Sequence, residues 1–233
     1  MTIADNIAAI ESKVSAACVR AGRNRADITL VAVTKTRTPT EMDEAIKAGI
    51  TQVGENRVQE ALSKKPLVTL TAKWHLVGSL QTNKAKRALE LFDVIQSIDS
   101  HNLAIELQRR CEQMDKHLNC FIEVNTSGEA SKHGVRPDAV PDLVAEVLKL
   151  DRLQLEGLMT IGPGLAIEDP EASRPCFGVL RTLVEDCRQR FGVPLPHLSM
   201  GMSSDFEVGI EEGATIVRIG TAIFGPRAQV KPE

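Results

Sequence analysis

The stretch DITLVAVTKTRTPTEMDEAIKAG, residues 27–49, joins one short strand to one helix, and this unit decides the fold. Residues 28–33 are apolar or β-branched, which is typical of a buried strand. Residues 39–48 then form a helix-like stretch. A strand followed by a helix is the repeating unit of proteins with a parallel sheet.

The same alternation continues along the chain. The further candidate strands are residues 50–54, 74–78, 94–98, 120–125, 155–160, 197–201 and 215–220. The further helix-like stretches are residues 55–64, 82–92, 102–116, 137–150, 175–191 and 204–212. We therefore predict a (β/α)8 TIM barrel. One extra N-terminal helix precedes it, with apolar residues at helical spacing: Ile3, Ile7, Ile10, Val14 and Ala17.

An open doubly wound sheet is the alternative fold. Such sheets usually have fewer strands and a glycine-rich first turn, and neither GxGxxG nor GxxxxGK[ST] occurs in this sequence. No proline- or serine-rich linker divides the chain, so we expect one domain over residues 1–233.

The composition narrows the class of function. A net charge of −3 offers no electrostatic basis for binding nucleic acid or an anionic membrane. The sequence has no apolar run of the roughly 20 residues that span a bilayer and no signal-like apolar start. The 5 cysteines are scattered without CxxC pairs, as in reduced proteins. We expect a cytoplasmic protein, and a monomer because a barrel with a polar exterior can stand alone.

Lys35 follows the first strand at the end where TIM barrels place their chemistry. Side chains alternate along a strand, so Val31, Val33 and Lys35 share one face. If that face points into the barrel, Lys35 emerges above an apolar floor, where burial lowers an amine pKa and favours a Schiff base. The alternative is a lysine that simply extends into solvent.

Arg218 lies on the last strand, which a closed barrel pairs with the first. By the same alternation, Ile216, Arg218 and Gly220 share a face, so we expect Arg218 to point inward close to Lys35. A buried arginine needs a partner. That partner is either a ligand or an inward carboxylate such as Glu123 or Glu55.

The segments after the last two strands resemble the phosphate position of TIM barrels. Met202-Ser203 and Gly220-Thr221 offer backbone amides and hydroxyls there. The alternative for Ser203 and Ser204 is helix capping. An amine, an arginine and a phosphate cradle across one barrel mouth favour a phosphorylated aldehyde cofactor.

Seven motifs resemble the YggS/PROSC family of PLP-binding homeostasis proteins (PLP, pyridoxal 5′-phosphate), whose barrel is similar to the N-terminal barrel of alanine racemase. They are VAVTKTR (31–37), GENRVQE (54–60), WHLVGSLQTNK (74–84), QSIDS (96–100), EVNTSGEASKHG (123–134), GLMTIGP (157–163) and LSMGMSSDFEVGIEEGATIVRIGTAIFGPR (198–227). They occur in order over nearly the whole chain.

The resemblance implies roles for particular residues. It places PLP covalently on Lys35, with Arg218 facing the pyridine nitrogen and Asn56 near the ring hydroxyl. It also implies phosphate contacts from Ser203, Gly220 and Thr221. Two further residues match motif positions but have structural alternatives. His75 could be a buried structural histidine, and Lys132, which matches a loop lysine thought to receive or transfer PLP, could be a solvated charge.

The resemblance also favours binding over turnover. Arginine does not normally give up its proton, so at the pyridine nitrogen it acts only as a donor and leaves the ring a weak electron sink. In the alanine racemase pattern a second base is a tyrosine from another domain. This sequence has 0 tyrosines, and we expect no second domain to supply one. We therefore expect a carrier or buffer of PLP in vitamin B6 and amino-acid homeostasis, with apo-PLP enzymes as possible recipients. The alternatives are a PLP-dependent amino-acid racemase and a Schiff-base aldolase that uses Lys35 without PLP.

Overall fold

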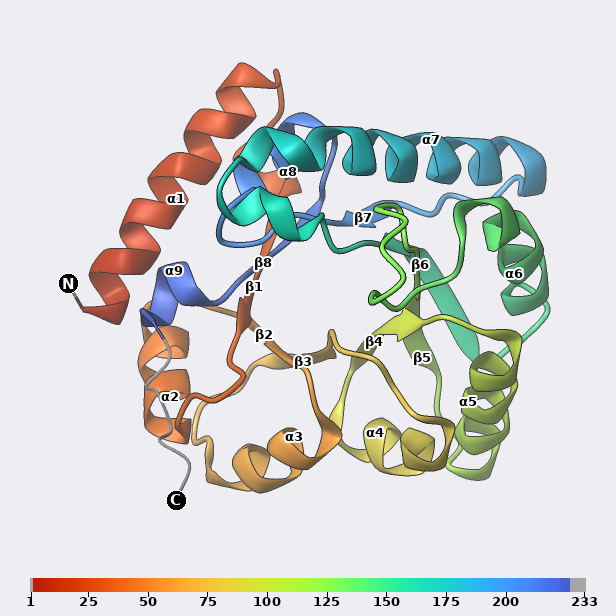
Figure 1. Cartoon of the computed structure of the whole chain (residues 1–233). Helices are drawn as coiled ribbons and strands as arrows, with labels where there is room; N and C mark the ends of the chain where they lie inside the picture. Colours follow the sequence, from red (N-terminus) through yellow and green to blue (C-terminus); the bar gives the residue numbers. More distant parts are fainter. Residues whose placement is uncertain (1, 227–233) are drawn as a thin grey trace.

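Eight parallel strands close into a barrel, and helices surround it (Figure 1). The computed structural model describes residues 2–226. The strands are β1 (Thr29–Val33), β2 (Gln52–Glu55), β3 (Lys73–Leu76), β4 (Val94–Ile98), β5 (Leu118–Glu123), β6 (Leu153–Met159), β7 (His197–Ser199) and β8 (Ile216–Ile219). Each strand pairs with its neighbour in sequence, and β8 pairs with β1.

The helices alternate with these strands. They are α1 (Ile3–Arg20), α2 (Pro39–Lys47), α3 (Val58–Lys64), α4 (Ala85–Leu91), α5 (His101–Gln113), α6 (Val140–Val147), α7 (Arg174–Phe191), α8 (Phe206–Glu211) and α9 (Thr221–Phe224). The predicted TIM barrel with an added N-terminal helix is confirmed.

The main differences from the predicted elements occur where helices begin. The predicted helices 82–92 and 137–150 each start with a 3-10 turn, Thr82–Lys84 and Pro137–Ala139. The helix predicted over 204–212 begins later, at Phe206, because Asp205 accepts a hydrogen bond from the Met202 amide at 2.7 Å and holds the preceding turn.

Alternate strand residues form two separate apolar layers. Inside the barrel, the buried cluster consists of Val31, Val94, Phe121, Met159 and Ile216. The residues between them pack outward against the helices in a larger core, as Leu30 and Ala32 do on β1. The inward direction expected for Val31 is therefore confirmed. A filled interior of this kind leaves the chemistry to the loops at the barrel ends.

The N-terminal helix α1 lies outside the ring of helices, beside α8 and α9 (Figure 1). Its buried face consists of Ile7, Ile10, Val14, Ala17 and Cys18. Asn6 Nδ2 donates to the Ile223 carbonyl at 2.8 Å, and Arg23 donates to the Ile210 and Ala214 carbonyls. The helix thus braces the two elements that follow β7 and β8.

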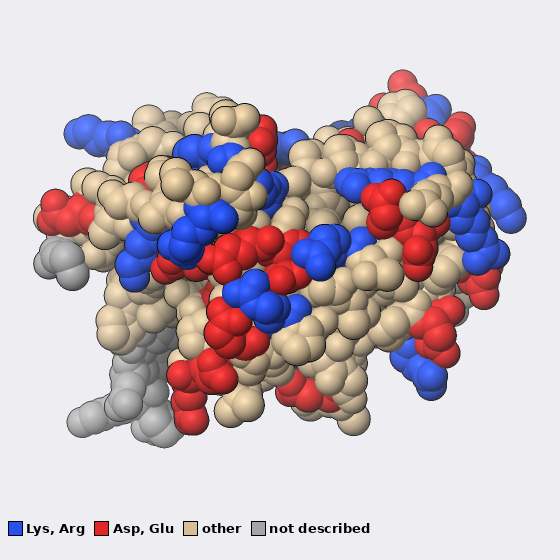
Figure 2. All heavy atoms as spheres, turned by 90° about the horizontal axis from the view of Figure 1, so that it is seen from above, with Lys and Arg blue, Asp and Glu red and all other residues tan. Residues whose placement is uncertain are grey.

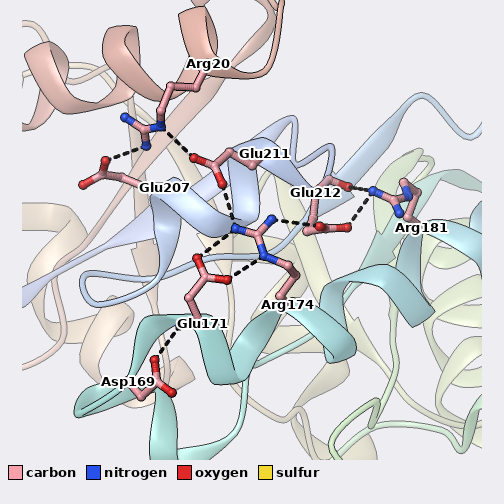
Figure 3. A network of polar contacts seen from close by, with 8 residues as sticks. All are labelled: Arg20, Asp169, Glu171, Arg174, Arg181, Glu207, Glu211 and Glu212. Atoms are coloured by element: carbon pink, nitrogen blue, oxygen red, sulfur yellow. Dashed lines mark hydrogen bonds and ion pairs between the residues drawn. The ribbon is translucent and has the colours of Figure 1, made fainter.

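Ion pairs join α1 to α8 and α8 to α7 (Figure 3). Arg20 contacts Glu207 and Glu211, each at 2.8 Å. Arg174 contacts Glu211 at 2.8 Å and Glu212 at 3.0 Å. Basic and acidic side chains also intermix on the face that Figure 2 shows from above. Within residues 2–226, no helix combines the length and apolarity needed to cross a membrane.

Candidate functional site

Lys35 lies in the turn after β1, half-buried, next to a residue with an unusual backbone conformation. Thr36 has a φ of 64°, in the left-handed region that β-branched residues rarely adopt. Such a conformation persists where surrounding contacts hold it. Here the Thr36 amide donates to Glu60 Oε2 at 2.9 Å.

A buried polar cluster holds the residue on the other side of Lys35. The Thr34 hydroxyl donates to Glu55 Oε1 at 2.6 Å, and the Thr34 carbonyl accepts from Lys64 Nζ at 2.9 Å. Lys64 also contacts Glu55 at 2.9 Å and Glu60 at 3.0 Å. We call Glu55, Glu60 and Lys64 the turn clamp, because together they fix the backbone on both sides of Lys35.

The turn clamp includes Glu55, one of the two carboxylates suggested as a partner of Arg218. Glu55 has the same strand parity as Val53, which belongs to the outer core, and its carboxylate binds Lys64 on α3. It therefore faces the helices. The suggestion that Glu55 pairs with Arg218 is wrong.

Arg218 is 3% exposed and lies inside the barrel. Its Nη1 donates to Ser199 Oγ at 2.6 Å and its Nη2 donates to the Thr160 carbonyl at 2.7 Å. Burial lowers the pKa of Arg218 to about 10, and the charges of Glu123 and Asp205 oppose that shift. The guanidinium is therefore charged at neutral pH. In the strand register Arg218 lies opposite Val31, so it sits deeper in the barrel than Lys35.

Glu123 is the other ionisable group that acts on Arg218 inside the barrel. It is 4% exposed, and among the described residues its Oε2 has no hydrogen-bond partner. Burial raises the pKa of Glu123 to about 7, although the charge of Arg218 acts to lower it. Within residues 2–226, Glu123 forms no ion pair with Arg218 and acts on it only through its charge. The hydrogen-bond partners of Arg218 are thus a hydroxyl and a carbonyl.

The loops after β7 and β8 meet at Ser203. Its hydroxyl oxygen accepts from the amides of Gly220 and Ala222, each at 3.3 Å. A Cβ on Gly220 would lie 3.1 Å from the Val33 carbonyl oxygen, so glycine permits this close approach to β1. The geometry gathers a hydroxyl and two amides in one place, with both amides donating to the hydroxyl oxygen. Hydroxyls and backbone amides are the kinds of group that bind anions.

One expectation about these loops needs adjustment. Ser203 and Ser204 do not cap α8: the N-cap residue of that helix is Asp205, and the Ser203 hydroxyl accepts from amides at the start of α9 instead. Thr221, which stays a proposed phosphate contact, is exposed at the start of α9, next to the Ala222 amide. The last residue of the motif 198–227, Arg227, lies outside the described residues.

Asn56 directly follows β2 and is half-buried. Its backbone packs against Gly78, which follows β3: a Cβ on Gly78 would overlap the Asn56 carbonyl oxygen. A side chain at 78 would therefore push Asn56 away from its position. Close packing of the two loops fixes Asn56 at the same end of the barrel as Lys35.

Lys132 and His75 lie in different surroundings. The Lys132 ammonium binds the Gly162 carbonyl and pairs with Glu129 at 3.1 Å, which ties the loop after β5 to the loop after β6. His75 is 2% exposed and lies in the barrel interior, where burial lowers its pKa to about 3. It is a neutral, hydrogen-bonded histidine.

A cavity of about 140 Å³ opens at the opposite end of the barrel, where the strands begin. Lys73 and Glu156 flank it, and His75 and His197 contribute to its wall. The loops that bring Ser203, Gly220 and Ala222 together lie at the other end of the barrel. Within residues 2–226, no three His, Cys, Asp or Glu side chains group as a metal site.

Sequence reasoning missed the residues that hold Arg218 and the Lys35 turn. Gln96 and Ser199 are polar residues at inward positions of β4 and β7, two residues after Val94 and His197. The two-residue spacing along each strand would have predicted that both side chains point into the barrel. The pairing of Lys64 with Glu55 had no comparable signal, because it depends on how α3 packs on β2.

Comparison with known proteins identifies the family. Residues 6–228 match the model of the family described as alanine racemase, N-terminal domain. The pyridoxal phosphate homeostasis protein of Aquifex aeolicus is 44% identical over 228 residues, covering 97% of this chain and 99% of that protein. The protein of the same name in Escherichia coli K12 is 40% identical over 236 residues, covering 97% of each.

Solved structures agree with these relatives. PipY of Synechococcus elongatus, with PLP bound, is 33% identical, and the alignment covers 96% of this chain and 100% of that one with a TM-score of 0.84. PipY without PLP gives a TM-score of 0.86 at 34% identity, with the same coverage. With its eight-stranded barrel, its buried arginine on β8 and its sequence matched almost from end to end, this chain belongs to the alanine racemase N-terminal domain family and, within it, groups with the pyridoxal phosphate homeostasis proteins.

Proposed function

We propose that this protein binds PLP at the C-terminal mouth of its barrel, on Lys35, and serves in PLP homeostasis as a carrier or buffer. The observation that carries the proposal is the gathering of three groups at this mouth. They are the Lys35 amine on a braced turn, the buried Arg218 guanidinium, and the cradle of Ser203, Gly220 and Ala222. The PLP-bound PipY structure supports the same ligand.

The residues fit PLP at both ends of its ring. The aldehyde carbon and the ring nitrogen lie on opposite sides of a pyridine, and Lys35 and Arg218 differ in depth in the barrel. Lys35 supplies the nucleophile, and Arg218 supplies a donor that keeps its proton. The cradle donors suit the phosphate, and Asn56 is the proposed contact for the ring hydroxyl side. When bound, PLP supplies an aldehyde and an aromatic electron sink.

We further propose that the protein lacks robust catalytic turnover. Arg218 is a poor proton source for the ring nitrogen, and the chain contains 0 tyrosines to act as a second base. The relatives carry the name of homeostasis proteins, which agrees with this proposal. We propose that residues 1–233 act as one monomeric cytoplasmic domain that passes PLP to apo-PLP enzymes and binds neither nucleic acid nor membranes.

The binding proposal is tested by the visible absorption of protein incubated with PLP. We expect wild type to become yellow and Lys35→Ala to remain without the protein-bound chromophore. Lys73→Ala is the matched control, because Lys73 flanks the cavity at the other end of the barrel. Borohydride reduction followed by peptide mapping should place the label on Lys35. Label on another lysine, or a wild type that stays colourless, contradicts the proposal, and the second result favours an aldolase without PLP.

The carrier proposal is tested separately on PLP-loaded protein. We expect no sustained change in enantiomer ratio when it is incubated with L-alanine or L-serine, and we expect activation of an added apo-PLP enzyme. Efficient racemisation would establish the racemase alternative. If the protein activates no apo-enzyme while PLP stays bound, the carrier role is refuted and the buffer role alone is retained.

A further inference from the structure

A chain of hydrogen bonds crosses the barrel interior from Arg218 to the opposite end. Arg218 Nη1 donates to Ser199 Oγ at 2.6 Å, and Ser199 Oγ donates to Gln96 Oε1 at 2.6 Å. Gln96 Nε2 lies 2.8 Å from His75 Nδ1, and His75 Nε2 lies 2.7 Å from Gln52 Oε1. The chain joins β8, β7, β4, β3 and β2, and its members from Arg218 to His75 are at most 3% exposed.

The chemistry of arginine sets the direction of every bond in this chain. A guanidinium only donates, so the Ser199 oxygen accepts from Arg218 and its proton goes to Gln96 Oε1. The Gln96 amide nitrogen therefore faces His75 and donates to Nδ1. His75 is left with its proton on Nε2, which donates to Gln52. Each acceptor along the chain is oriented to favour positive charge on Arg218.

Among the described residues, no carboxylate is hydrogen-bonded to Arg218. Glu123 and Asp205 act on it only through their charges, and Glu55 faces the helices. The Thr160 carbonyl anchors Nη2, but one hydrogen bond does not by itself fix the orientation of the planar guanidinium. The orientation of the guanidinium therefore depends on the Ser199 hydroxyl, which in turn depends on Gln96.

We propose that His75 and Gln96 are positioning residues for Arg218: through Ser199 they orient its guanidinium toward the ring of the bound cofactor and sustain its charge. This inference rests on the proposed binding of PLP. Neither residue is among those proposed above to hold the cofactor. His75 acts from the floor of the barrel, at the end opposite Lys35.

The first test needs no cofactor. Nitrogen NMR of the apoprotein with labelled histidine reports which ring nitrogen carries the proton. We expect His75 to be neutral, with Nδ1 unprotonated and Nε2 protonated, and we expect Gln96→Leu to disturb this state because it removes the donor to Nδ1. A wild-type His75 with its proton on Nδ1, or one that Gln96→Leu leaves unchanged, overturns the inference whether or not PLP binds.

The second test uses the PLP-loaded protein. We expect His75→Leu to weaken PLP affinity about tenfold, the loss associated with one hydrogen bond in a charge-assisted chain. It should also shift the absorption maximum in the same direction as Arg218→Lys. His75→Asn should restore both values, because its Oδ1 can accept from Gln96 as Nδ1 does.

The matched control is Ser97→Ala. Ser97 is a neighbour of Gln96 on β4, is 0% exposed, and its hydroxyl has no hydrogen-bond partner among the described residues. We expect no shift of the spectrum in this variant. If His75→Leu leaves the spectrum of bound PLP unchanged, or if Ser97→Ala shifts it equally, the positioning role is refuted. If wild type binds no PLP on Lys35 while the NMR result holds, the proposed function alone fails.

Discussion

Glu123 and Arg218 are two buried ionisable groups that act on each other inside the barrel. Arg218 has a hydroxyl and a carbonyl as partners, whereas Glu123 Oε2 has none among the described residues. A buried carboxylate without partners is disfavoured in its charged form. At the residue scale, burial opposes both charges, but the arginine stays charged at neutral pH whereas the glutamate holds its proton up to about pH 7.

This asymmetry predicts a pH-dependent stability for the apoprotein. The pKa of Glu123 is raised from 4.5 to about 7 on folding, so the folded protein holds the extra proton between these values. The contribution of protonated Glu123 to the free energy of unfolding is fully present below about pH 4.5 and is lost as pH rises through 7. The glutamine of Glu123→Gln cannot ionise. We therefore expect the unfolding free energy of this variant to rise by ~3 kcal/mol relative to that of wild type between pH 4.5 and 8.

Denaturant unfolding of both proteins across this pH range measures the difference. Other groups titrate equally in the two proteins, so the difference isolates Glu123. A difference in unfolding free energy that does not change with pH would contradict the assignment.

Lys64 is the residue on which the turn clamp depends. Lys64→Met leaves Glu55, whose side chain is 0% exposed, without its cation. We expect the unfolding free energy to fall by about 3–5 kcal/mol, the usual result of breaking a buried pair on one side. Adding Glu55→Gln should recover much of the loss, and Lys86→Met on the exposed face of α4 should cost little. If Lys64→Met were as stable as wild type, the turn clamp would not be needed for stability.

At the scale of elements, close backbone contacts position the loops at the mouth. The β3 loop approaches Asn56 where Gly78 has no side chain, and the β8 loop approaches Val33 at Gly220. Neither contact is visible in helix or strand periodicity, because each joins residues of different βα units. The candidate site is thus assembled by contacts between elements.

Gly78→Ala tests this packing. The added methyl group meets backbone, which cannot rotate away, so we expect a loss of ~1–3 kcal/mol in stability and weaker PLP binding. Gly164→Ala is the control, because a Cβ there meets nothing within 4 Å. Calorimetry and PLP titration of both variants measure the effects. Equal behaviour of the two variants would count against close packing as the cause.

On the scale of the whole molecule, α1 packs on α8 and α9. These two helices lie beside the cradle of Ser203, Gly220 and Ala222. The contacts that hold it include a buried apolar face and the exposed Arg20 ion pairs (Figure 3). Burial of apolar surface outweighs exposed ion pairs in water. We expect the apolar face to dominate.

Ile10→Ala and Arg20→Ala separate the two contributions. Ile10 is 4% exposed, and its truncation should cost ~2–4 kcal/mol. Arg20→Ala should leave the thermal midpoint nearly unchanged, with any effect vanishing at high salt. Thermal unfolding at low and high ionic strength measures both. A larger loss from Arg20→Ala than from Ile10→Ala would show that the ion pairs hold the helix.

The sequence by itself determined the eight βα units, the added N-terminal helix and the inward face of Val31, because these depend on periods of two and 3.6 residues within single elements. Strand ends also marked Lys35, Arg218 and Ser203. Only the tertiary structure decided which of these side chains have partners. The bond from Ser199 to Gln96 joins residues 103 positions apart, and the pairing of Glu55 with Lys64 depends on how a helix packs on its strand. Such contacts follow from barrel closure and strand register, which no local pattern encodes.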